Sequence, residues 1–166
     1  MTAIASQTPL LGFAGLMLAA ALSDIRALRI PNRIPLAAVL LYPVHVLWAQ
    51  TPIDWAGALA IASAALALGF IWFKFRIVGG GDAKLFAAAA LWAGPELVIP
   101  FALSTAIAGG VLAAFLWLMH HLPLLGIPVA LPSTAAAADF GKQPLPYGVA
   151  IALGAAFVTL TLTGAV

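Results

Sequence analysis

Apolar residues run almost without interruption along this chain and group into segments separated by short polar, glycine-rich or proline-rich stretches. The runs are continuous and do not alternate with polar residues, which favours helices over strands. They predict six helices, near residues 8–25, 34–49, 55–73, 77–93, 97–119 and 146–165. Each is close to the ~20 residues that cross a ~30 Å hydrocarbon core, although the second and fourth are short. Pro35 and Pro43 predict a bent second helix.

The composition of the chain indicates that these helices are membrane spans. The chain is 64% hydrophobic and 7% charged, against roughly 25% charged residues in soluble domains. A soluble domain of this size would bury only about 70% of its unfolded surface, too little to hide so many apolar side chains. We therefore predict an all-α integral membrane protein, a bundle of six transmembrane helices that forms a single domain over residues 1–166.

The first apolar segment has a competing interpretation. Leu10 to Leu22, followed by small residues, is similar to the core of a signal peptide. Such a peptide begins with positive charge, and no Lys or Arg precedes this segment. We therefore expect a retained first span.

The basic residues orient the bundle. With six spans, all seven Lys and Arg fall on one side of the membrane, and the opposite connections carry only Asp54 and Glu96. Because basic loops face the cytoplasm, we predict that both termini lie outside. The basic residues are Arg26, Arg29, Arg33, Lys74, Arg76, Lys84 and Lys142. A pI near 9.4 that rests on so few charges indicates a basic membrane edge and no nucleic-acid partner. The long connection 120–145, rich in proline and alanine, is a candidate flap.

Two of the five acidic residues fall inside predicted spans. Asp24 lies near the inner end of the first, and Asp82 follows three glycines in the fourth. An Asp at the centre of a membrane helix costs about 2.5–3.5 kcal/mol, and less near the edge. Taken singly, each is also explained as an interfacial residue that caps a helix or reaches water. Asp54, Glu96 and Asp139 are expected to be solvated loop charges.

The run Gly79-Gly80-Gly81 predicts a break in the fourth span. Glycine permits positive φ and the close approach of another segment. Irregular backbone at membrane depth is tolerated only beside protein or a wet cavity. The run is also explained as a flexible turn, but with Asp82 beside it we predict a wet notch that carries a carboxylate.

Two carboxylates at a wet notch suit acid–base hydrolysis. Held close together they share a proton, so that one activates water while the other polarises a peptide carbonyl. Asp82 starts a helix, which favours its anion, and Asp24 lies toward the end of one, which favours its protonated form.

Three segments resemble the type IV prepilin peptidases, a family of membrane aspartic proteases with a Gly-x-Gly-Asp motif. They are Asp24-Ile-Arg-Ala-Leu-Arg-Ile-Pro-Asn32, Gly79-Gly-Gly-Asp-Ala-Lys-Leu85 and Leu145-Pro-Tyr-Gly148. The resemblance implies a hydrolase, a leader-processing aspartic endopeptidase, in which Asp24 and Asp82 are the catalytic pair and no cofactor or metal takes part. The residues that it implies to shape the site are Pro31, Asn32, Gly79, Gly80, Gly81, Lys84, Pro146, Tyr147 and Gly148. We expect Lys84 to extend to water, since it lies two residues from Asp82, and we leave open whether Tyr147 reaches the site or the membrane interface.

The resemblance also implies a substrate and a location. The substrate is a prepilin with a short basic leader, a glycine at the cut and a long apolar helix, processed at the cytoplasmic face of the inner membrane among its lipids. Larger relatives carry paired cysteines linked to N-methylation. This chain has no cysteine, so we expect a peptidase without methyltransferase activity, similar to the compact enzymes of Flp pili. An archaeal preflagellin peptidase and a homodimer stay open.

Other functions are also compatible with the sequence. A small transporter or channel subunit can use the Asp pair as an ion relay, and a scaffold subunit can carry an inactive site. The motifs of lipoprotein signal peptidases do not match. His120-His121 has no third ligand and is expected at the membrane edge, and His45 is expected to make a polar contact within the bundle.

Overall fold

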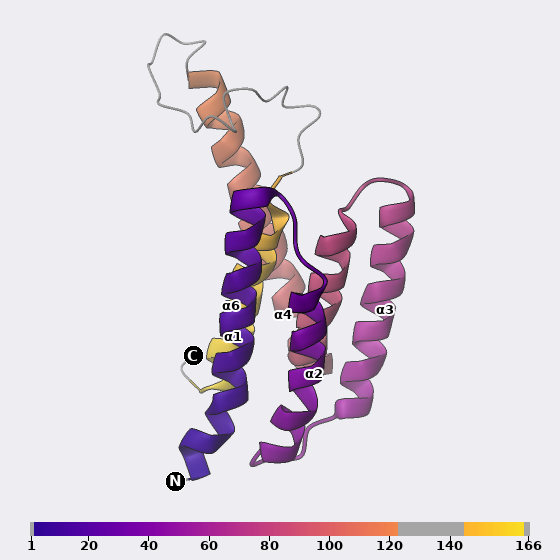
Figure 1. Cartoon of the computed structure of the whole chain (residues 1–166), viewed down its shortest axis with the longest axis vertical. Helices are drawn as coiled ribbons and strands as arrows, with labels where there is room; N and C mark the ends of the chain where they lie inside the picture. Colours follow the sequence, from indigo (N-terminus) through magenta and orange to yellow (C-terminus); the bar gives the residue numbers. More distant parts are fainter. Residues whose placement is uncertain (1, 123–144, 165–166) are drawn as a thin grey trace.

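The computed structural model describes residues 2–122 and 145–164, and the regular structure in these ranges is helical, as predicted. Figure 1 shows the helices side by side in one bundle. The helices are α1 (Thr2–Ala27), α2 (Arg33–Trp48), α3 (Trp55–Lys74), α4 (Gly80–His121) and α6 (Tyr147–Leu162). The candidate flap, with Asp139 and Lys142, falls on residues 123–144 and so lies outside the described residues.

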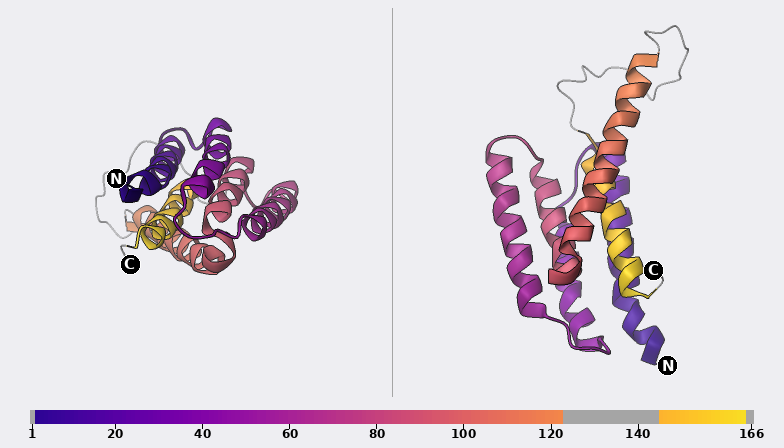
Figure 2. Two further views of the ribbon diagram at one scale, coloured as in Figure 1. Left: turned by 90° about the horizontal axis from the view of Figure 1, so that it is seen from below. Right: turned by 180° about the vertical axis from the view of Figure 1, so that it is seen from behind.

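Helix α4 consists of two arms that meet at Gly94. The backbone there leaves the helical region, with φ 61° and ψ −172°, and Pro95 follows directly. The arms, residues 80–93 and 95–121, run in opposite directions (Figures 1 and 2). They correspond to the separate helices predicted near residues 77–93 and 97–119, so the described residues hold six helical segments.

Three helices of the described part are long and apolar enough to cross a membrane. They cover Gln7–Ala27, Trp55–Lys74 and Gly80–Met119, while Arg33–Trp48 and Tyr147–Leu162 are apolar but shorter. The 40 residues of the third would measure about 60 Å as one straight helix, twice the hydrocarbon thickness. The reversal at Gly94 folds that length back on itself. A membrane protein is supported, and the six-span topology with both ends outside stays a prediction.

We expect Gly94→Ala to destabilise the protein. The combination of φ 61° and ψ −172° is accessible almost only to glycine, although space for a methyl group exists, with Ala58 Cβ 3.9 Å away. Backbone strain of this kind costs about 1–3 kcal/mol. Thermal unfolding in detergent should show a lower midpoint for Gly94→Ala and an unchanged or higher one for Gly110→Ala, whose added methyl meets open space inside a helix. Equal midpoints for the two variants would contradict this.

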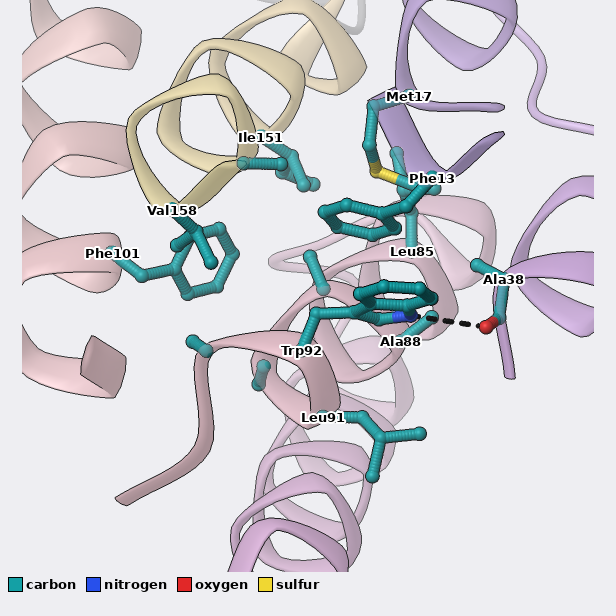
Figure 3. Packing of buried hydrophobic residues seen from close by; sticks show 14 of the residues in the cluster. Phe13, Met17, Ala38, Leu85, Ala88, Leu91, Trp92, Phe101, Ile151 and Val158 are labelled. Carbon is teal, nitrogen blue, oxygen red and sulfur yellow. Dashed lines mark hydrogen bonds between the residues drawn. The ribbon is translucent and has the colours of Figure 1, made fainter. Parts of the chain in front are cut away.

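The helices pack around the first arm of α4. Helix α1 packs against α2 and α6, and both of these pack against α4, with α3 along its other side (Figure 2). Close to the centre, Phe13 of α1 stacks on Trp92 of α4 with ring centroids 4.4 Å apart. The Trp92 indole donates a hydrogen bond to the Ala38 carbonyl of α2 at 3.0 Å (Figure 3). Ala87–Ala90 on α4 are buried, and such small residues allow close helix packing.

Basic residues gather at one end of the bundle. In Figure 1, the end of α1, the end of α3 and the start of α4 lie toward the same end, and the start of α1 and the end of α6 lie toward the other. Arg26, Arg29, Lys74, Arg76 and Lys84 belong to the first group by their positions in the chain. The connection after α1 descends into the bundle before α2 begins (Figure 1).

Candidate active site

Asp24 lies in the last turn of α1 and is almost fully buried, with 5% of its surface exposed. The helix ends after Ala27, because Leu28 adopts a left-handed conformation with φ 48°. The side-chain oxygen Oδ2 of Asp24 accepts a hydrogen bond from the backbone N–H of Gly148 at 2.7 Å. Gly148 is the second residue of α6, where backbone N–H groups have no partner within their own helix. Asp24 therefore joins the end of α1 to the start of α6.

Asp82 is the third residue of α4. Gly79 is the N-cap, with an extended backbone at φ −66° and ψ 141°, and Gly80 and Gly81 form the first turn. The glycines thus lie at the start of the helix and do not interrupt it, and the interior break of α4 is at Gly94. The prediction that the three glycines break the fourth span is therefore corrected, because the break lies at Gly94.

Each of the three glycines lies close to a neighbouring group. The described glycines with positive φ are Gly94 and Gly164, so a left-handed backbone is not the reason for the run. A Cβ on Gly79 would lie 2.6 Å from Oδ2 of Asp82, and one on Gly80 would lie 3.2 Å from the Phe73 ring. A Cβ on Gly81 would lie 3.2 Å from Cβ of Ile30. Close approach, the other property expected of these glycines, explains all three.

Both carboxylates line one cavity of about 700 Å³. It lies between the connection after α1 and the start of α4, and its volume falls in the range of ligand pockets. The lining residues are Ser23, Asp24, Ala27, Leu28, Arg29, Ile30, Pro31, Asn32, Gly79, Gly80, Gly81, Asp82, Lys84 and Leu145.

The third motif segment reaches the site only in part. Pro146 is the N-cap of α6, and Gly148 contacts Asp24. Tyr147 is not among the cavity residues, and its ring packs over Gly109 in the second arm of α4, where an added Cβ would lie 2.6 Å from it. The structure thus places the Tyr147 ring against the second arm of α4, which is neither of the two roles left open for it.

Lys84 has a partner that its spacing did not indicate. Its Nζ donates a hydrogen bond to Oδ1 of Asn32 at 2.9 Å, and both residues line the cavity. Lys84 is exposed, as expected for a side chain that extends to water, and the hydrogen bond to Asn32 adds a partner to that picture. The two-residue spacing shows only that Lys84 and Asp82 leave the helix in different directions.

The argument from helix ends does not separate the two carboxylates. Asp82 lies in the first turn of α4, as expected, but Asp24 faces the first turn of α6 through Gly148. The positive end of a helix is thus close to each. The assignment of Asp82 as the anion and Asp24 as the protonated partner loses its physical basis.

Sequence reasoning missed several lining residues, among them Ser23, Ile30 and Leu145. The Ser23 hydroxyl donates to the Arg29 carbonyl at 2.7 Å and ties the connection after α1 back to that helix. Its position next to Asp24 was an available signal, and Ile30 belongs to the quoted Ile-Pro-Asn segment. Leu145 likewise opens the quoted Leu145-Pro-Tyr-Gly148 segment.

Other polar residues lie away from the cavity. Asp54 caps α3, since its Oδ1 accepts the Gly57 N–H at 2.9 Å, so it is more than a solvated loop charge. His45 is buried and stacks on Trp92, and its Nδ1 has no hydrogen-bond partner, so the expected polar contact is replaced by aromatic packing. His121 stacks on Trp117. In the described residues no three His, Cys, Asp or Glu side chains gather as a metal site would require.

The fold and the site together indicate a membrane-associated helical protein with a cavity at one end that two carboxylates line. The profile of a family described as the type IV leader peptidase family matches residues 11–114. Because the match covers more than half of the chain, this protein belongs to the type IV leader peptidase family. Searches of the curated proteins and of the solved structures gave no significant match. The matched range contains Asp24 and Asp82, whereas Gly148 lies beyond it.

Proposed function

We propose that this protein is a membrane aspartic endopeptidase that removes the short basic leader from type IV prepilins of the Flp kind. Asp24 and Asp82 are its catalytic residues, and the cut is made at the cytoplasmic face of the inner membrane. The observation that carries the proposal is that both carboxylates line the same cavity, although 58 positions in sequence separate Asp24 from Asp82.

The pair performs the hydrolysis without a covalent intermediate. The ionised carboxylate takes a proton from a water molecule, and the hydroxide oxygen bonds to the carbonyl carbon of the scissile peptide. The protonated carboxyl group gives its proton to the carbonyl oxygen. When the tetrahedral intermediate collapses, the C–N bond breaks and the amine leaves with a proton from the pair. Gly148 holds Oδ2 of Asp24 during these steps, which leaves Oδ1 for water or substrate.

The depth of the site suits such a substrate. The first arm of α4 covers residues 80–93 and so spans only about 21 Å, less than the ~30 Å hydrocarbon core. Asp82 at its start then lies close to the level where an apolar substrate helix meets its polar leader. Arg29 and Lys84 line the cavity, and anionic lipid headgroups offset this positive charge when a basic leader approaches.

Reconstitution with a Flp-type prepilin tests the proposal. The purified protein in liposomes should convert the prepilin to a shorter product, and mass spectrometry should place the new N-terminus directly after the leader. With S-adenosylmethionine present, the product mass should stay that of the unmethylated chain. A methylated product would remove the peptidase-only part of the proposal.

The same liposomes distinguish the ion-relay alternative. A pH-sensitive dye trapped inside should report no proton flux that depends on Asp24 or Asp82. Flux that is lost in Asp82→Asn, together with an uncut prepilin, would replace the peptidase with a relay subunit.

A further inference from the structure

The connection between α1 and α2, residues 28–32, makes hydrogen bonds to residues that are close in sequence to each of the two carboxylates. At its start, the Arg29 carbonyl accepts the hydroxyl of Ser23, the residue before Asp24. At its end, the side chain of Asn32 accepts Nζ of Lys84, two residues after Asp82. This 28–32 loop therefore links the end of α1 to the first turns of α4.

Asn32 occupies the N-cap position of α2 but does not cap the helix with its side chain. It is the N-cap of α2, where an asparagine side chain commonly accepts an N–H of the first turn. Its backbone is helical instead, with φ −56° and ψ −22°, and its side chain makes no capping hydrogen bond. The oxygen that would cap α2 instead accepts a hydrogen bond from Nζ of Lys84 at 2.9 Å.

A second contact seats the same loop on α4. Gly81 lies against Ile30 so closely that an added Cβ would stand 3.2 Å from Cβ and 3.4 Å from the carbonyl oxygen of Ile30. Ile30 is only 7% exposed. The loop thus meets α4 at two points on one face of the helix, through apolar contact of Ile30 with Gly81 and through the hydrogen bond of Asn32 with Lys84.

We infer that the Lys84–Asn32 hydrogen bond is a latch that keeps the 28–32 loop on α4 and thereby sets the spacing of the two carboxylates. Lys84 and Asn32 are positioning residues in this scheme, which rests on the proposed function for its effect on catalysis. Helices α1 and α4 are connected mainly by α2 and α6, which pack against both of them. The 28–32 loop adds a direct contact between the end of α1 and the start of α4 at the level of the site. Releasing the latch lets the loop lift and the carboxylates separate.

Thiol labelling measures the loop without reference to catalysis. The chain has no cysteine, so Ile30→Cys introduces a single thiol at the buried contact. In this background, Lys84→Met and Asn32→Leu should each speed the reaction with a water-soluble methanethiosulfonate about fivefold, the change expected from losing an ordinary hydrogen bond. The double variant should be no faster than either single variant, because both remove the same bond. Asn32→Asp keeps an acceptor for Lys84 and should label at the parent rate.

Lys74→Met is the matched control, since Lys74 is an exposed lysine in the last turn of α3 and does not line the cavity. It should leave the labelling rate unchanged. In the protein without the introduced cysteine, Lys84→Met and Asn32→Leu should lower kcat about tenfold through misplacement of the carboxylates, with KM nearly constant. Labelling rates that stay at the parent value, or effects that multiply in the double variant, would overturn the latch. If labelling changes as expected but the wild type cuts no prepilin, the latch stands and the proposed function fails.

Discussion

Asp24→Asn and Asp82→Asn should each lower prepilin cleavage by about 10²–10⁴-fold, the usual contribution of a positioned acid or base. Each substitution keeps the size of the side chain and removes its ability to exchange a proton. In Asp24→Asn the amide oxygen of the new side chain can still accept the Gly148 N–H, so the tie between α1 and α6 is retained. Rates of leader removal in liposomes, with circular dichroism to verify the helical fold, measure the effect.

Asp54→Asn is the control for this pair of variants. Asp54 caps α3 through the Gly57 N–H, and asparagine caps a helix about as well as aspartate. It lies outside the cavity, so its variant should cleave at the wild-type rate. Full activity in either Asp24→Asn or Asp82→Asn would exclude a two-carboxylate mechanism, whatever the control shows.

The sequence was most informative about features that depend on one short segment of the chain. The apolar runs predicted the helical segments because each contains enough continuous hydrophobic residues to define itself. The candidate pair stood out because a carboxylate is costly inside an apolar span. The cap at Asp54 was predictable in the same way, since it directly precedes an apolar run, although it was assigned to solvent.

The contacts that complete the site depend on distant segments. Lys84 reaches a residue 52 positions earlier, and Gly148 one 124 positions earlier. Spacing along one helix indicates the direction in which each side chain points, but not which residue of another segment it contacts. For the same reason, the sequence points partly to backbone freedom for the glycine run, whereas the structure places Ile30 and Phe73 tightly against Gly81 and Gly80.

Gly148→Ala should lower cleavage about 100-fold, the scale of loss when a reacting group is misplaced by about 1 Å. An alanine Cβ at this position would lie 2.9 Å from Oδ2 and 3.1 Å from Cβ of Asp24, and 2.9 Å from Cδ1 of Ile30. The side chain of Asp24 is held between α1 and α6, so either the carboxylate or the start of α6 must move. The kinetics of leader removal should show the loss in kcat.

Two further variants separate displacement of the carboxylate from simple overpacking. Ile30→Val removes the methyl group that Gly148→Ala would press on, but it leaves both contacts with Asp24. The double variant should therefore stay impaired, whereas recovery of the wild-type rate would assign the defect to Ile30. Gly110→Ala, with no atom within 4 Å of the added methyl, should cleave normally. Because Gly148 lies beyond the residues matched by the family profile, the result tests the geometry of the site independently of that match.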